Sequence, residues 1–217
     1  MILLIFFLLS SSEINHLDSV KEDISSEFRL KIQEANKMFS GVVIGISAGI
    51  ISSLIDDELK ELSDKMRAKE LGKIMSLPGD GLIITPLVLG GYIYGFISEN
   101  QKLKNAFLKS MSNLLFSTIA VQILKFSGRK RPSETDFQYD FSFPGIKSRF
   151  RSFPSGHAQA SSAVYFTLGK HLCENKLCSI ILFSVPPIVS FGRILGNNHW
   201  FSDTISGMII GVSFELF

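Results

Sequence analysis

The stretch Pro154-Ser155-Gly156-His157 is the part of this chain that says most about its fold and chemistry. A proline ends the preceding extended segment, and a serine side chain can cap a helix that begins near His157. The glycine lets a backbone N–H approach a ligand without an intervening side chain. Because a helix N-terminus offers free N–H donors and a partial positive charge, such a start favours a bound phosphate. An ordinary capped helix start has the same residues, so the tetrapeptide alone fits either interpretation.

A second polar pair lies close to the C-terminus. His199 and Asp203 are four residues apart, which places both on one face of a helix that begins there. A carboxylate bonded to one imidazole nitrogen fixes the tautomer and leaves the other nitrogen as a nucleophile. A surface ion pair at a helix start is the alternative interpretation. Trp200, the only tryptophan of the chain, is expected at a membrane interface.

Lys125, Arg131 and Arg193 are the cations that fit this chemistry. Basic residues beside the end of an apolar helix usually anchor it at a membrane interface. That explanation suffices for four other cations, namely Lys130, Lys147, Arg149 and Arg151. Like charges gathered beside the histidines in a site of low dielectric constant need an anion to compensate them. Since an arginine offers a planar fork suited to phosphate oxygens, the three cations predict a phosphate site.

The composition limits the classes of protein to which the chain can belong. Its 217 residues suffice for one domain with a sizeable core. Charged residues make up 19% of the chain and its net charge is +2, with no long basic run, so nucleic-acid binding is not expected. The mean hydropathy of +0.27 is high for a soluble enzyme and low for a protein made only of membrane-spanning helices.

Six apolar segments follow the charged N-terminal part of the chain. All have the length of a helix and are rich in glycine, serine and alanine, which let helices approach closely inside a membrane. None shows the sustained alternation of a strand. We therefore predict an all-α bundle of about six helices that cross a membrane; a buried soluble bundle is the alternative. The segments are 38–55, 81–97, 106–124, 158–172, 177–191 and 204–217.

The N-terminal part divides into two segments. Residues 1–12 begin with nine apolar residues, too few to cross a bilayer, and end in serines, which is typical of a secretory signal or a short surface anchor. Residues 13–37 are expected to form a solvated, charged helix, and residues 38–217 the functional domain. Within this domain, residues 56–73 predict one amphipathic helix on a membrane surface or at the end of the bundle. Its apolar face carries Leu59, Leu62, Met66 and Leu71.

Two further short motifs are given structural roles only. Pro78-Gly79-Asp80-Gly81 predicts a turn that starts the next helix. Cys173 and Cys178 are the only cysteines, and we expect two free thiols at helix ends, although their spacing also permits a local disulfide. A structural zinc site requires four ligands, and only His171 lies nearby.

The polar residues together resemble the three ordered motifs of the type 2 phosphatidic acid phosphatase superfamily, which includes acid phosphatases, lipid phosphatases and vanadium haloperoxidases. The first motif is present as Lys-Phe-Ser-Gly-Arg-Lys-Arg-Pro at residues 125–132, and the second is intact at residues 154–157. The third matches in spacing, with five residues between Arg193 and His199 and three between His199 and Asp203. The resemblance implies the helical bundle of that superfamily, and the membrane-associated lipid phosphatases are the branch it fits.

Two departures from the family pattern concern the first and third motifs. The family leaves six residues between its lysine and Arg-Pro, whereas here there are five, and Leu124 occupies the expected lysine position. We expect Lys125 to reach the site through a local adjustment of the helix end. Gly192 stands where the family has a serine, so a hydroxyl contact to phosphate is lost unless the Gly192 N–H replaces it.

Carried over to this chain, the resemblance implies a role for each motif residue. His199 attacks phosphorus and forms a phosphohistidine, Asp203 orients His199, and His157 protonates the leaving group and then activates water. The phosphoryl oxygens are held by Lys125, Arg131, Ser155, Gly156 and Arg193. The family uses no metal or other cofactor for this chemistry, because the cations stabilise the transition-state charge.

The resemblance implies a membrane-associated phosphatase that removes the terminal phosphate of a lipid phosphate or polyprenyl diphosphate. A soluble, exported acid phosphatase of broad specificity is the alternative within the family. From other classes, a metal-dependent hydrolase with His157, His199 and Asp203 as ligands, or a non-catalytic phosphate or lipid binder, also fits the residues. A haloperoxidase fits less well, because those chains are much longer.

Chain topology gives a separate expectation. If the six segments cross a membrane, the loops after the third and fifth segments lie on one side, and these loops carry the motifs. An exported start suits a bacterial cytoplasmic membrane with the site facing the periplasm or the outside. Four lysines then lie on the cytoplasmic side, as the charge rule expects: Lys102, Lys104, Lys170 and Lys176.

Overall fold

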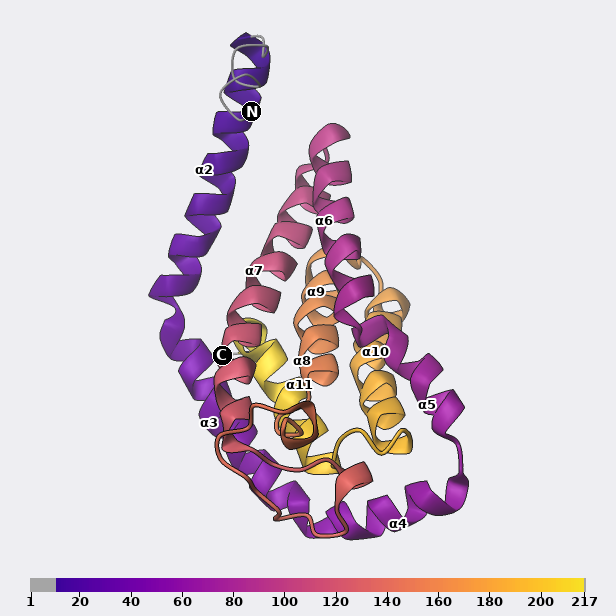
Figure 1. Cartoon of the computed structure of the whole chain (residues 1–217). Coiled ribbons are helices and arrows are strands. Elements are labelled where there is room, and N and C mark those ends of the chain that lie inside the picture. The colour runs from indigo at the N-terminus through magenta and orange to yellow at the C-terminus, as the bar shows by residue number, and fades with distance from the viewer. Residues whose placement is uncertain (1–10, 217) are drawn as a thin grey trace.

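The computed structural model describes residues 11–216, and there the chain forms a bundle of helices (Figure 1). In this part of the chain the single β-type contact is an isolated bridge between Arg129 and Phe141. The all-α prediction is therefore confirmed. The longer helices are α2 (Ser11–Gln33), α3 (Ala35–Ser52), α4 (Asp56–Met66), α5 (Lys69–Ser76), α6 (Gly81–Ile97), α7 (Gln101–Leu124), α10 (Lys176–Leu195) and α11 (Phe201–Leu216).

One further continuous helical stretch completes the bundle. It consists of α8 (Gly156–Ser161), a π-helical turn (Ser162–Phe166) and α9 (Thr167–Leu172). Each of the six predicted apolar segments thus coincides with a helix. The segment predicted at 81–97 has the bounds of α6, while α11 begins at Phe201 instead of at the predicted residue 204.

Helix α11 lies inside the bundle, where α3, α7 and α8 pack against it. Small residues allow this close packing. At Gly41 of α3, an ideal Cβ atom would lie 2.1 Å from the Cβ of Ser213, so only glycine fits there. At Gly207 of α11, a Cβ would lie 2.4 Å from the carbonyl oxygen of Ser155. These contacts bring the start of α11 against the start of α8.

Four helical stretches within residues 11–216 are long and apolar enough to cross a membrane: Ala35–Met66, Lys69–Ile97, Gln101–Ser127 and Lys176–Leu195. The stretch from α8 to α9 and helix α11 are not among them. Their buried positions are largely serine, threonine, alanine and glycine. Because protein surrounds these two helices, they have no need of the long apolar side chains that face lipid.

The prediction of a single amphipathic helix at 56–73 is wrong in one respect, because the structure divides this segment into α4 and α5. The break lies at Arg67, whose backbone adopts a left-handed conformation with φ of 49°. Leu62, Met66 and Leu71 remain largely exposed. Helix α4 runs across the end of the bundle, and α5 turns back along its side (Figure 1).

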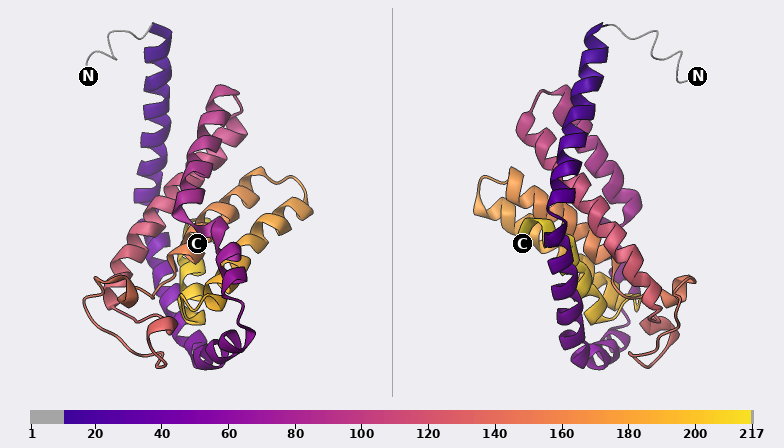
Figure 2. Two further views of the ribbon diagram at one scale, coloured as in Figure 1. Left: turned by 45° about the vertical axis from the view of Figure 1, so that its right-hand side comes forward. Right: turned by 90° about the vertical axis from the view of Figure 1, so that its left-hand side faces the viewer.

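The helix predicted in the charged segment 13–37 is present as α2. It projects beyond the bundle on the side away from α4 (Figure 2). It is not solvated all round. Glu27 is buried and accepts a hydrogen bond of 2.9 Å from the Ser112 hydroxyl, and Asp23 forms a 2.6 Å ion pair with Lys104. Of the signal-like segment predicted at 1–12, the first ten residues lie outside the described part of the chain.

The prediction of two free thiols is wrong. Cys173 and Cys178 form a disulfide across the connection between α9 and α10, with Cα atoms 5.5 Å apart. The Cys-x4-Cys spacing permits this bridge because α9 ends at Leu172 and lets the chain turn.

Candidate active site

The two loops that carry the motifs lie at the same end of the bundle, beside α4 (Figure 1). Trp200 Nε1 donates a hydrogen bond of 2.9 Å to the carbonyl oxygen of Lys130. The Ser133 N–H donates one of 3.2 Å to the Asn197 carbonyl oxygen. At the opposite end, Lys102 pairs with Glu174 at 2.7 Å. The predicted placement of both motif loops on one side is therefore confirmed.

Ser155 joins the second motif to the third. Its hydroxyl oxygen caps α8 by accepting from the Ala158 N–H at 3.5 Å, as the sequence predicts. Its own N–H donates a 2.9 Å hydrogen bond to the carbonyl oxygen of Asp203. Since Gly207 packs on the Ser155 carbonyl, the helix start at Gly156 is fixed directly beside the start of α11.

His199 and Asp203 face each other as predicted. His199 Nδ1 lies 3.6 Å from Asp203 Oδ2, and both side chains are buried. The same carboxylate oxygen accepts hydrogen bonds from the Trp200 N–H at 2.9 Å and from the Ser152 hydroxyl at 2.5 Å. With Nδ1 turned to the carboxylate, Nε2 of His199 is the nitrogen left for a nucleophilic role.

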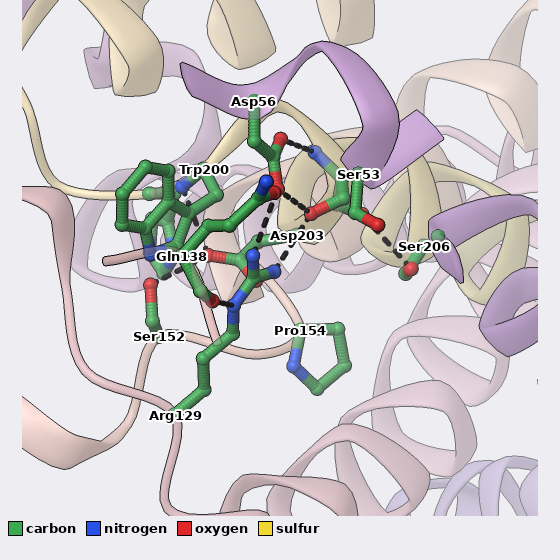
Figure 3. Close-up of polar contacts among 12 residues, drawn as sticks. Ser53, Asp56, Arg129, Gln138, Ser152, Pro154, Trp200, Asp203 and Ser206 are labelled. Atoms are coloured by element: carbon green, nitrogen blue, oxygen red, sulfur yellow. Dashed lines mark hydrogen bonds and ion pairs between the residues drawn. The ribbon is translucent and has the colours of Figure 1, made fainter. Parts of the chain in front are cut away.

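Arg129 is a buried partner of Asp203 that the sequence did not single out. Its guanidinium donates to Asp203 Oδ1 at 2.7 Å and to Asp56 Oδ2 at 2.8 Å, with all three side chains buried (Figure 3). Its Nε donates to the carbonyl oxygen of Gln138 at 2.9 Å. Burial raises the pKa of Asp203, but Arg129 and His199 outweigh burial and lower this pKa to about 2. Asp203 therefore stays ionised.

Asp56 completes this buried network from the start of α4. Its carboxylate accepts from the Ser202 N–H at 2.9 Å and from the Ser202 hydroxyl at 2.5 Å. A single arginine is thus shared by two carboxylates and one backbone carbonyl. A buried ion pair needs such additional hydrogen bonds to offset the desolvation of its charges. The one sequence signal was the Gly-Arg-Lys-Arg run, which gave no reason to separate Arg129 from its neighbours.

Lys125 reaches the second motif despite the shortened spacing. Its Nζ donates to the carbonyl oxygens of Pro154 at 2.6 Å and Arg151 at 3.0 Å. Its Cε would lie 3.9 Å from a Cβ built on Gly156. Leu124 instead packs against a cluster that contains Val121. The adjustment is a 3-10 turn, Lys125–Ser127, that follows α7 and changes the direction in which the lysine projects.

The other two predicted phosphate-binding cations, Arg131 and Arg193, come from different elements of the fold. Arg131 lies in the first motif loop, and its Nε donates to the Ser148 carbonyl oxygen at 3.1 Å. Arg193 lies in the last turn of α10, and its Nε is buried without a hydrogen-bond partner. A buried guanidinium N–H without a partner is unusual, because a buried donor that lacks an acceptor costs free energy. Arg193 is thus ready to bind an anion.

The two histidines are held in their neutral forms. Burial and, to a smaller extent, the charge of Arg193 lower the pKa of His157 to about 4. Burial likewise lowers the pKa of His199 well below its usual value, although the Asp203 contact opposes this. A neutral His199 keeps its lone pair for attack on phosphorus.

The sequence expectation for Trp200 is wrong, and the structure gives a reason for the glycine at position 192. Trp200 does not mark a membrane interface: it is 1% exposed, and Arg129 lies over its ring at 5.4 Å. Gly192 faces α5, where an added Cβ would lie 2.8 Å from the Gly72 carbonyl oxygen. A serine at 192 would collide with α5, which explains the glycine.

Comparison with known proteins agrees with this geometry. The model of the PAP2 superfamily matches residues 107–217, which contain all three motifs. The chain belongs to the PAP2 superfamily. This membership confirms the resemblance and the phosphatase class that it implied. None of the curated protein sequences compared with the chain matches it significantly.

Two solved structures share this fold. LpxE of Aquifex aeolicus aligns with a TM-score of 0.55 at 24% identity, covering 71% of this chain and 88% of its own. A transmembrane PAP2-type phosphatidylglycerolphosphate phosphatase of Bacillus subtilis aligns with a TM-score of 0.58 at 20% identity, covering 82% and 91%. The four long apolar helices identify the chain as a membrane protein.

Proposed function

We propose that this PAP2 protein is a lipid phosphatase that works through a phosphohistidine on His199, without a metal. The observation that carries the proposal is the buried pair of His199 and Asp203, with Arg193, whose Nε has no hydrogen-bond partner, close enough for its charge to act on His199. His199 has an ionised carboxylate beside one ring nitrogen and a cation nearby that can bind an anion. This arrangement suits attack on a phosphoryl group.

The proposed reaction has two steps. His199 Nε2 attacks phosphorus, and an N–P bond forms as the bond to the leaving oxygen breaks. The leaving oxygen keeps that electron pair and takes a proton from His157, which receives this proton from the substrate monoanion, while Asp203 stabilises the positive charge on His199. A water molecule then attacks the phosphohistidine, His157 removes the water proton, and phosphate departs with His199 restored.

The phosphoryl oxygens are held by groups from three elements. Lys125 and Arg131 come from the first motif loop, and Arg193 from the end of α10. Ser155 and the Gly156 N–H add the positive end of the helix that starts at α8. Charge that develops on the equatorial oxygens in the transition state is thereby neutralised without a metal ion.

A lipid substrate is supported by an apolar cavity next to the site. Its volume is about 110 Å³, and α4, α10 and the start of α11 form its walls. The apolar residues that line it are Leu59, Leu62, Met66, Phe191, Ile194, Leu195 and Phe201. Ile194 and Phe201 are close in sequence to Arg193 and His199, which places the cavity at the same end of the bundle as the proposed catalytic residues.

We further propose the place of the enzyme and its substrates. The protein lies in a bacterial cytoplasmic membrane, and its site faces the periplasm or the outside. Its substrate is a lipid phosphate or a polyprenyl diphosphate, and nucleic acid is not a partner. The phosphatidylglycerolphosphate phosphatase with the same fold supports a phospholipid substrate.

The test is phosphate release from phosphatidic acid and undecaprenyl diphosphate in detergent with EDTA present, comparing the wild type with His199→Ala. Release by the wild type alone supports the proposal and begins to rank the substrates. Loss of wild-type activity in EDTA would favour a metal-dependent hydrolase instead; among residues 11–216, no three His, Cys, Asp or Glu side chains are grouped as metal ligands. Binding without turnover would favour a non-catalytic lipid binder. Extraction without detergent would favour a soluble acid phosphatase.

A further inference from the structure

Asp80 faces the second histidine of the site. It lies at the N-terminus of α6, where its Oδ1 accepts a 2.8 Å hydrogen bond from the Leu82 N–H and so caps the helix. Its other carboxylate oxygen, Oδ2, lies 3.5 Å from His157 Nε2. The helix cap and the histidine contact therefore use different oxygens of one side chain.

Backbone contacts fix the position of this carboxylate. The Asp80 N–H donates a 3.0 Å hydrogen bond to the Leu77 carbonyl oxygen, which closes the turn before α6. The preceding Gly79 packs on His157 itself, since a Cβ at Gly79 would lie 2.6 Å from the His157 carbonyl oxygen. The distance between Asp80 and His157 thus depends on two packed backbone segments instead of on long, mobile side chains.

Three charged groups from different elements face His157. Arg193 comes from the end of α10, Arg131 from the loop after α7, and Asp80 from the start of α6. The two arginines suit phosphate binding, but their charge opposes protonation of His157, as burial does. Asp80 has the opposite effect and favours the protonated imidazole.

We propose that Asp80 is a positioning residue that orients His157 and supports its protonated form during leaving-group departure. The inference rests on the proposed phosphatase reaction. With the Nε2 proton directed at Asp80, Nδ1 is the nitrogen that serves the substrate. In the first step, Nδ1 takes up the proton that the substrate monoanion brings and passes it to the leaving oxygen as the P–O bond breaks. In the second step, Nδ1 takes a proton from the attacking water, and Nε2 keeps its own proton throughout.

The kinetic test uses Asp80→Asn, because asparagine caps a helix as well as aspartate and has nearly the same shape. Asp140→Asn is the matched control, since Asp140 lies in the motif loop and pairs with Lys130 at 2.7 Å. An alkyl phosphate requires protonation of its leaving group, whereas an activated aryl phosphate does not. We expect Asp80→Asn to lower kcat about 10-fold on the alkyl ester and less than about twofold on the aryl ester, while Asp140→Asn changes neither.

A second measurement reads the contact without turnover. Nitrogen-15 NMR of histidine-labelled protein at neutral pH reports which ring nitrogen of His157 carries the proton. We expect the Nε2-protonated form in the wild type and a mixture in Asp80→Ser, which keeps a capping hydroxyl but is too short to reach the ring.

The outcomes separate this inference from the function on which it rests. A wild-type protein that hydrolyses neither ester would overturn the phosphatase proposal, and the role of Asp80 with it. Normal wild-type turnover, combined with an equal loss on both esters or no loss in Asp80→Asn, would overturn the role of Asp80 alone. The same conclusion would follow if the His157 tautomer were unchanged in Asp80→Ser.

Discussion

Replacing Arg129 with glutamine should destabilise the protein more than any other single charge removal in the motif loops. The substitution leaves the carboxylates of Asp203 and Asp56 buried without their shared cation, and both are fully buried. Removing one partner of a buried ion pair typically costs about 3–5 kcal/mol. For a chain of this size, such a loss lowers Tm by roughly 6–20 °C. The Ser152 hydroxyl and the Trp200 N–H still hold Asp203, which places the expectation toward the lower part of this range.

Lys130→Gln is the matched control, because it removes the neighbouring positive charge from the same loop. Lys130 pairs with Asp140 at 2.7 Å, but both side chains are 29% exposed. Half-exposed pairs of this kind contribute about 0–1 kcal/mol. Thermal unfolding of both variants in one detergent, followed by tryptophan fluorescence, gives the comparison. A change of 1 kcal/mol corresponds to about 2–4 °C in Tm for a chain of this size. A Tm for Arg129→Gln within about 2 °C of that for Lys130→Gln would therefore refute the reasoning.

The double variant Asp56→Asn/Arg129→Gln tests the cause. Asp56→Asn removes one of the two carboxylates that Arg129→Gln leaves uncompensated. We therefore expect the double variant to be more stable than the sum of the two single losses predicts, by roughly 1–3 kcal/mol. Additive losses would show that the two side chains do not share one network.

Three further predictions concern the site. Asp203→Asn should lower kcat at least about 100-fold while substrate binding persists, because the imidazolium of His199 loses its counter-charge; the kinetics of phosphate release measure this. His157 is neutral in the free enzyme above its pKa of about 4, so the reacting proton enters with a substrate monoanion. Since a phosphate monoester loses that proton near pH 6, kcat/KM should fall about tenfold per pH unit above this value, and a flat profile between pH 6 and 8 would contradict it. Gly207→Ala places a Cβ 2.4 Å from the Ser155 carbonyl oxygen and should lower stability by about 1–3 kcal/mol and reduce turnover, whereas Gly81→Ala, with open space around it, should leave turnover unchanged.

The motif residues could be predicted from the sequence because their spacing reflects the helices that carry them. His199 and Asp203 meet across one helical turn, and Ser155 caps the helix that the sequence indicates. The six apolar segments also coincide with helices, since apolar content and length are local properties of the chain. Even in the shortened first motif, Lys125 reaches the second motif as expected, while Leu124 turns away.

Contacts between distant segments could not be predicted in this way. Arg129 looks like its basic neighbours until the fold brings it to Asp56, 73 residues earlier in the chain. Asp80 looks like an ordinary turn residue until its loop packs on His157. Trp200 was expected at a membrane surface by its residue type, but the loop that carries Lys130 covers it. The surroundings of each of these three residues depend on tertiary packing, which cannot be read from a single sequence.

The central claim is that His199 carries the phosphoryl group, and trapping that intermediate tests it most directly. The wild-type protein would be mixed briefly with phosphorus-32-labelled phosphatidic acid in detergent with EDTA, quenched in alkali and cleaved into peptides. The account predicts label on the peptide that contains His199, stable to alkali and lost in acid, and no label in His199→Ala. Wild-type turnover with no labelled protein, or label that persists in His199→Ala, would contradict it.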